Sequence, residues 1–242
     1  MTLKYIFAKP DYVENVGDVY PILLKDYDRF QEVSKILYIS KKHFVETELP
    51  LLVLIQFNAQ HLGFEDQELY LSLEELFSIV MRDEVKFHIE PNSKTIYFLS
   101  KDGGIIDFSN YDIVRSIIMR QNLIFEQKVY KNPKMQEWAN KILETRQKNS
   151  SNISIEDIIS TVSVLKGVNY SELQNYSLYQ LYADFYRARK IKKYETDVVF
   201  KSVDTSWSIE DFAEDLDLFK NPYDDLFVDK GKLSKLDKAL KS

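Results

Sequence analysis

The first 40 residues change from a pattern typical of strands to one typical of a helix. Residues 5–7 and 19–23 are short apolar runs, and Pro10 and Gly17 interrupt the stretch between them, so extended structure is expected here. From residue 26 to residue 40 the apolar side chains recur every three or four positions. This spacing predicts an amphipathic helix with one buried face.

Two more helices are expected before the pattern changes. Residues 49–62 are apolar on most faces, which predicts a buried helix that ends at Gly63. Ser72 has Glu75 three residues after it, the spacing of a capping box, so the next helix is predicted to begin there. Both helices carry large apolar side chains that are candidates for the core.

Residues 85–108 instead alternate apolar and polar positions, as strands do. Three such runs, at residues 85–89, 95–99 and 105–108, are separated by turn sequences rich in Pro, Asn, Asp and Gly. The short connections predict a three-stranded antiparallel meander.

Helical periodicity dominates the rest of the chain. Ser154 and Ser177 are predicted N-caps, and Gly167 is predicted to end the helix between them. The longest helix keeps one apolar face for about six turns. The predicted helices span residues 111–120, 133–147, 154–166, 170–174 and 177–199, with a last short one at residues 208–216.

Together these elements predict an α+β protein. An N-terminal domain of residues 1–148 would hold a small antiparallel sheet packed by helices, and residues 153–217 would form an all-helical C-terminal module. The polar stretch at residues 148–152 is the expected linker. Residues 218–242 are rich in charge and are expected to form a loosely ordered tail.

Composition narrows the classes of function. The 242 residues are 45% hydrophobic, enough for a buried core, and the absence of cysteine excludes disulfides, thiolate metal sites and a nucleophilic thiol. A net charge of −6 argues against general affinity for nucleic acid.

The longest apolar run, residues 49–55, is far shorter than a membrane span, and residues 1–10 lack the pattern of a signal peptide. We therefore expect no membrane partner and action in a reducing cytoplasm.

No cofactor or metal site is expected from the sequence. His43, His61 and His88 fall on different predicted elements, and none has a second ligand at the spacing of a metal site. The two adjacent glycines near residue 103 are followed by a strand and not by a helix, so they predict a turn and not a phosphate loop.

One set of residues suggests a remote enzymatic alternative. Asp11 with the later pair Glu84 and Lys86 is similar to the acidic and lysine residues with which metal-dependent nucleases hold a divalent ion. More than seventy residues separate the two parts, and surface salt bridges are the simpler explanation. A nuclease therefore stays a remote alternative.

Charge is segregated in the last quarter of the chain. Five bases fall within residues 187–193, whereas residues 204–229 hold nine acids and the single base Lys220. Such blocks can fold onto one another or pair with a neighbouring protein, and the alternative is that each is a solvated surface. The flanking acids would repel phosphates, which argues against nucleic acid at the basic block.

Tyrosines gather on the same predicted helix. Their apolar bodies and polar tips are common at protein interfaces and equally common on half-buried helix faces, so both interpretations stay open. In the first interpretation the tyrosines and the bases would contact a partner together. The residues predicted to do so are Tyr179, Tyr182, Tyr186, Arg187, Arg189, Lys190 and Lys193.

Several apolar and aromatic motifs of the chain resemble a known group of phage proteins. They include residues 12–23, the strand motif Ile105-Ile106-Asp107, residues 154–160 and the helix motif Leu178-Tyr179-Gln180-Leu181-Tyr182. On these motifs, residues 5–203 resemble the tail-morphogenesis proteins of tailed bacteriophages of Gram-positive hosts, which are tail assembly chaperone-like proteins or minor tail components.

The resemblance implies a non-enzymatic role in building the tail, with no catalytic residue and no cofactor. The implied partners are other tail proteins, in particular the tape-measure or tube protein, and a homo-oligomer is an alternative. The protein would act in the host cell cytoplasm during assembly, as a chaperone or as a component that stays in the virion tail. A second hypothesis is a phage protein that binds and inhibits or triggers a bacterial defence component.

Overall fold

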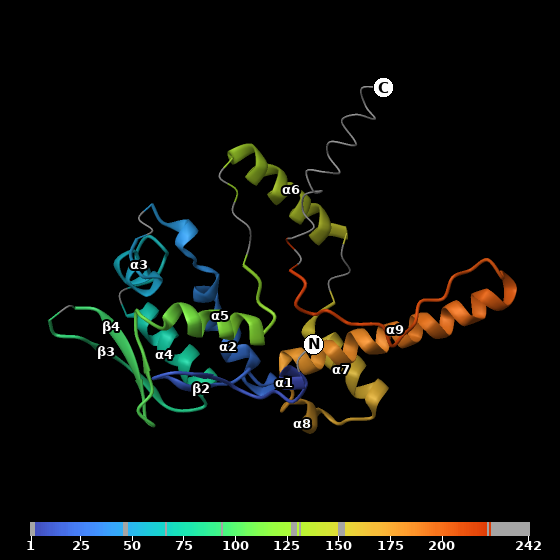
Figure 1. Cartoon of the computed structure of the whole chain (residues 1–242), viewed down its shortest axis with the longest axis horizontal. Helices are drawn as coiled ribbons and strands as arrows, with labels where there is room; N and C mark the ends of the chain where they lie inside the picture. Colours follow the sequence, from blue (N-terminus) through green and yellow to red (C-terminus); the bar gives the residue numbers. More distant parts are fainter. Residues whose placement is uncertain are drawn as a thin grey trace. The chain divides into compact units, whose positions relative to one another are not determined.

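The structure is a computed structural model that describes most of the chain (Figure 1). The described residues are 3–45, 48–65, 67–92, 94–126, 130, 132–149, 153–221 and 223. Contacts group the chain into two compact units. The first unit holds Met1–Ile124 and Ile155–Leu218, and the second holds Phe125–Ser154 and Phe219–Ser242.

The chain begins with a helical turn, α1 (Leu3–Ile6), followed by a two-stranded hairpin of β1 (Asp11–Val13) and β2 (Gly17–Val19). The prediction of extended structure at residues 5–7 is therefore wrong. The helical turn directs the ring of Tyr5 into the protein, 5.5 Å from the ring of Tyr179. A contact 174 residues along the chain overrides the local preference of this short segment.

Short helices fill the next part of the chain. The predicted helix at residues 26–40 is confirmed as α2 (Tyr27–Val33), but it continues as a 3₁₀ helix, η2 (Ser34–Tyr38). The predicted helix at residues 49–62 is shorter than expected, because α3 (Leu51–Phe57) ends well before Gly63. The other 3₁₀ helices are η1 (Leu24–Asp26) and η3 (Lys41–His43).

The long helix α4 (Glu68–Met81) begins one turn earlier than the sequence predicts. Ser72 lies inside this helix, so the predicted capping box is wrong. Leu69 is fully buried in the same cluster as Leu73 and Leu76, and the extra helical turn is what places it there. Burial of this side chain outweighs a local capping signal.

The predicted antiparallel meander is confirmed. Strands β3 (Val85–Ile89), β4 (Ile96–Ser100) and β5 (Ile105–Ile106) pair in that order, with Phe98 of β4 opposite both Phe87 and Ile106. Before β5 the backbone runs very close to the β1–β2 turn: a Cβ atom on Gly104 would lie 2.0 Å from the Val16 carbonyl oxygen. Glycine at this position lets the hairpin and the meander approach each other.

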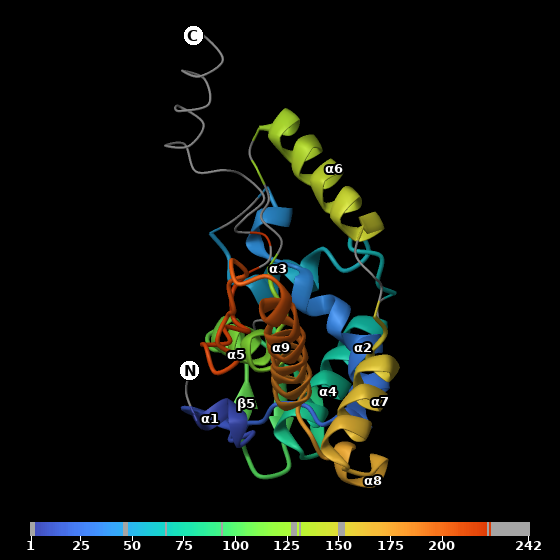
Figure 2. The same cartoon turned by 90° about the vertical axis from the view of Figure 1, so that its right-hand side faces the viewer.

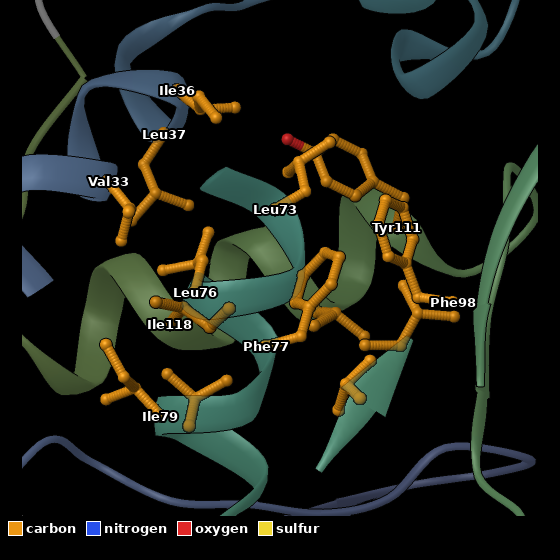
Figure 3. Packing of buried hydrophobic residues seen from close by; sticks show 14 of the residues in the cluster. Val33, Ile36, Leu37, Leu73, Leu76, Phe77, Ile79, Phe98, Tyr111 and Ile118 are labelled. Carbon is orange, nitrogen blue, oxygen red and sulfur yellow. The ribbon is translucent and has the colours of Figure 1, made fainter. Parts of the chain in front are cut away.

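The main core forms between α4, the meander and α5 (Tyr111–Gln121) (Figure 3). The ring of Phe77 lies at its centre, 4.9 Å from the ring of Phe98 and 6.3 Å from that of Tyr111, edge to face in both cases. Leu37 from η2 and Ile118 from α5 extend the same cluster. Helices on a small antiparallel sheet, followed by further helices, confirm the predicted α+β class.

The C-terminal helices of the first unit build a second cluster. They are α7 (Ile155–Lys166), α8 (Tyr170–Leu173) and α9 (Leu178–Val203). Figures 1 and 2 show α7 running beside the first turns of α9. Ser177 caps α9 as predicted, in a capping box with Gln180. The buried side chains of the second cluster are Ile158, Val162, Leu173, Leu181 and Phe185.

Backbone and side-chain hydrogen bonds join these helices to the start of the chain. The Leu24 amide donates to the Tyr176 carbonyl at 2.9 Å, and the Gln180 side-chain amide donates to the Ile6 carbonyl at 2.8 Å. Residues 155–218 accordingly share one compact unit with residues 1–124. The division into domains at residues 1–148 and 153–217 stays a prediction.

The second unit contains α6 (Pro133–Asn149), which begins at Pro133 as predicted. Its exposed side chains include Trp138, and Lys141 pairs with Glu137 one turn away at 2.7 Å. Part of the predicted linker, residues 150–152, lies outside the described residues, as does most of the predicted tail, of which residues 218–221 and 223 are described.

Candidate protein-binding site

Helix α9 carries three predicted partner-binding bases at intervals of three residues on one side. We call Arg187, Lys190 and Lys193 the basic face. Arg189 lies on a different side of the helix, where its guanidinium group is 5.7 Å from the ring of Phe185. The C-terminal turns of α9 extend past α7 and α8 (Figure 1).

Residues 204–217, which we call the acidic segment, turn back after α9 and lie along the basic face (Figure 1). The Arg187 guanidinium donates to the Phe212 carbonyl and, at 3.0 Å, to the Glu214 carbonyl. Lys190 donates to the Asp215 carbonyl at 3.4 Å and lies 3.7 Å from the Glu214 carboxylate. Both bases thus bind the backbone of the acidic segment, and Lys190 also pairs with one of its carboxylates.

One direct ion pair lies further along the helix. The Lys193 ammonium group is 2.6 Å from the Glu210 carboxylate. This hydrogen bond raises the pKa of Lys193 and lowers the pKa of Glu210. The structure therefore brings opposite charge blocks of the sequence together within one chain.

Aromatic rings pack between the charged contacts. The rings of Tyr194 and Phe212 are 5.1 Å apart, edge to face, and those of Phe200 and Trp207 are 5.4 Å apart. The Trp207 indole N–H also donates to the buried Asp197 carboxylate at 3.1 Å. These contacts fix where the acidic segment lies along α9, which charge attraction alone would not do.

The predicted helix at residues 208–216 is wrong, because this part of the acidic segment is extended and turned. In a helix ending at residue 216, the Phe212 carbonyl would accept a hydrogen bond from the backbone amide four residues later. Here it accepts from Arg187 instead, and Arg187 and Lys190 also donate to the Glu214 and Asp215 carbonyls. Contact with α9 thus takes one internal hydrogen bond of the predicted helix, and the ring contacts of the segment add to its docking.

The three predicted tyrosines fall in different environments. Tyr179 is 1% exposed, and burial raises the pKa of its phenol. Tyr182 is partly buried and packs against both core clusters. Tyr186 is exposed, and its ring stacks 6.2 Å from that of Tyr182. Of the three, Tyr186 presents the most surface to a partner, and Tyr179 has a core position.

Sequence reasoning missed four contributors to this surface: Phe200, Trp207 and Phe212, which make ring contacts, and Asp197, which accepts the indole hydrogen bond. A usable signal was present, because Trp207 and Phe212 are large aromatic side chains inside an otherwise acidic stretch. Aromatic side chains among solvated acids favour a segment that docks on another surface.

The residues of the nuclease alternative fall into two separate contact groups. Asp11 of β1 pairs with Lys4 and accepts a hydrogen bond from the Gln121 side chain at 2.8 Å. Lys86 of β3 lies 3.3 Å from the Glu74 carboxylate and 3.8 Å from that of Glu84. The structure thus brings Glu84 and Lys86 together, and gives Asp11 other partners.

Within the described part of the chain, no three His, Asp or Glu side chains are grouped so that they could hold a metal ion. Among the same residues, no helix combines the length and apolarity that a membrane span needs.

Similarity to known proteins points to a phage protein. Residues 146–216 match the family described as YomV second domain, a stretch that spans α7, α8, α9 and nearly all of the acidic segment. Over 217 residues the chain is 25% identical to the SPbeta prophage-derived uncharacterized protein YomV of Bacillus subtilis (strain 168), with 89% of each chain covered. No solved structure matches significantly. Phage origin is thereby supported, and neither match bears on tail morphogenesis.

The ion pair of Lys193 and Glu210 predicts how pH affects the acidic segment. The pKa of Glu210 lies below its ordinary 4.5, so its contribution is present above pH 4.5 and is lost as pH falls through the lowered pKa. The pKa of Lys193 lies above its ordinary 10.5, so its contribution is present below pH 10.5 and is lost as pH rises through the raised pKa. We expect the segment to dock between these limits and to loosen outside them.

Fluorescence of Trp207 measures this docking in a Trp138→Phe background, where it is the single remaining tryptophan. The emission should be constant at neutral pH and shift to longer wavelength below pH 4.5, while far-ultraviolet circular dichroism stays unchanged. Glu210→Gln, which has no carboxylate to protonate, should show a smaller acid shift. Identical titrations of the two proteins would contradict the assignment.

Proposed function

We propose that this phage protein is a non-enzymatic factor in tail assembly, which acts by binding other phage tail proteins. The observation that carries the proposal is the surface of α9, where Arg187, Lys190 and Lys193 with neighbouring aromatic rings already hold an acidic peptide segment. Surfaces of this composition are typical of protein interfaces. The similarity to a prophage-derived protein supports the phage context.

The role in the tail rests on the resemblance of the sequence motifs to tail-morphogenesis proteins. In this proposal the tape-measure or tube protein is the partner, met in the host cytoplasm during assembly. The protein either leaves as a chaperone does or stays in the tail as a minor component. Self-association through the same surface is a further arrangement, which sedimentation of the free protein distinguishes.

Affinity capture from cells that are producing phage tests the proposal. The tagged full chain should enrich tape-measure or tube protein, as quantified by mass spectrometry. The triple variant Arg187→Glu, Arg189→Glu and Lys190→Glu should lose most of this enrichment, because it reverses the charge that orients the partner.

A matched control reverses three exposed lysines elsewhere in the first unit, Lys35, Lys94 and Lys101, and should retain the enrichment. Capture of no tail protein would contradict the proposal. Capture of a host defence protein in place of tail proteins would also contradict it and would favour the defence-binding hypothesis.

A further inference from the structure

We propose that the basic face of α9 is a docking site for an acidic, aromatic-bearing peptide segment of a partner protein, and that the acidic segment of this chain occupies the site until the partner displaces it. This inference rests on the proposed protein-binding function and deepens it, because it specifies the chemistry of the partner. The contacts that hold residues 204–217 on α9 support it.

The contacts define which features a ligand needs. Arg187 and Lys190 bind a peptide backbone, since they donate to carbonyl groups of the acidic segment. Lys193 binds a carboxylate, that of Glu210, at 2.6 Å. Tyr194 receives the ring of Phe212.

The side chains of the acidic segment that contact α9 are regularly spaced along the chain. Glu210, Phe212 and Glu214 alternate along the acidic segment and all contact α9. The chain turns between the second and third of these residues, where the Glu214 amide donates to the Asp211 carbonyl at 3.2 Å. The ligand is therefore a segment that turns on α9 and has the pattern acid, aromatic, acid at every second position.

The acidic segment is held in a way that permits displacement. Its residues up to 215 are exposed or only partly buried, and the ion pairs that hold it face solvent. Solvent and salt weaken such pairs strongly. The aromatic contacts give the segment its position, and the same contacts are available to a competing aromatic side chain.

Occupancy by the acidic segment lowers the apparent affinity for an external ligand. A segment tethered directly to α9 competes at a high effective concentration, so external peptide binds in proportion to the fraction of open sites. Weakening the tethered segment should therefore tighten binding of the same sequence supplied externally. This increase distinguishes a shared site from binding elsewhere on the protein.

The experiment uses a fluorescein-labelled peptide with the sequence of residues 204–217 and measures its binding to full-length protein by fluorescence anisotropy. The double variant Glu210→Lys and Phe212→Ala weakens the tethered segment, and we expect it to bind the peptide at least about 10-fold more tightly than the wild type does. The control variant Glu195→Lys and Phe57→Ala changes an exposed acid and an exposed ring outside the contact and should match the wild type.

Further variants locate the site. Adding Lys193→Ala and Tyr194→Ala to the weakened protein should abolish the gain in affinity, while circular dichroism reports whether the protein remains folded. Equal binding to the wild-type and weakened proteins would overturn the proposal. Equal binding of a scrambled peptide would also overturn it, because net charge would then be sufficient.

Sedimentation of the free protein tests the rival occupant, the acidic segment of a second copy. We expect a monomer whose mass does not depend on the peptide. A dimer that dissociates when the peptide is added would overturn the proposal of a foreign partner in favour of exchange between copies. Peptide binding can succeed when no tail protein is captured from cells, so this test and the test of the proposed function fail independently.

Discussion

Phe77→Ala should lower the free energy of unfolding by about 3–5 kcal/mol, the usual cost of removing a fully buried ring. Phe77 is 1% exposed and lies where the rings of Phe98 and Tyr111 converge. Alanine would leave a cavity between α4, α5 and the meander, and the edge-to-face contacts of both neighbouring rings would be lost.

Urea denaturation followed by circular dichroism measures this loss, and Phe57→Ala is the matched control. Phe57 is at the end of α3 and is 67% exposed, so its removal should change stability by less than about 0.5 kcal/mol. Similar effects of the two substitutions would contradict the assignment of Phe77 to the centre of the core.

Leu181→Ala should lower the free energy of unfolding by about 2–5 kcal/mol. Leu181 is 0% exposed and belongs to the second cluster. Leu24, Ile155 and Tyr182 pack against both clusters, which joins the second cluster to the main core. We therefore expect the loss of stability to spread beyond the C-terminal helices.

Hydrogen exchange read by mass spectrometry tests whether the two clusters unfold together. In the Leu181→Ala protein, peptides from α4 should lose protection together with peptides from α7, because both belong to one compact unit. The control, Leu165→Ala on α7, removes a side chain that is 46% exposed and should leave both regions protected. Loss of protection confined to α7–α9 would instead support an independent module of residues 153–217.

Periodicity and capping predicted most of the fold, because long elements carry many consistent local signals. Helix α9 is an example: Ser177 caps it as predicted, and its predicted apolar face is buried in the first turns, at Leu178, Leu181 and Phe185. Farther along the same face Val199 is 65% exposed. The meander could be predicted from the sequence equally well, since alternating apolar and polar residues and short turns specify its register.

The errors occur where a distant contact overrides local preference. The turn at residues 5–7 is helical because Tyr5 packs on Tyr179, and α4 begins before Ser72 because Leu69 reaches the core. Residues 208–216 have a cap and apolar positions suitable for a helix, yet they dock on α9 through backbone carbonyls and an aromatic ring. Aromatic side chains among acids favour docking of such a segment, but a single sequence does not specify the surface on which it docks.

Only part of the candidate site was predicted, because the rest also depends on contacts between distant parts of the folded chain. Segregated charge identified Arg187, Lys190 and Lys193, and it left open whether the acids would dock on them or stay in solvent. The choice depended on where the chain turns after α9 and on the ring contacts of Trp207 and Phe212, which are properties of the folded chain.

Zero-length carbodiimide crosslinking tests most directly whether the acidic segment docks on the basic face of its own chain. This reagent joins a lysine to a carboxylate in direct contact, and Lys166 with Asp184, also 2.6 Å apart, provides an internal control. In a mixture of isotope-labelled and unlabelled protein, we predict a crosslink between Lys193 and Glu210 within single chains. Formation of the control crosslink without that of Lys193 and Glu210, or their crosslinking between different chains, would contradict the account.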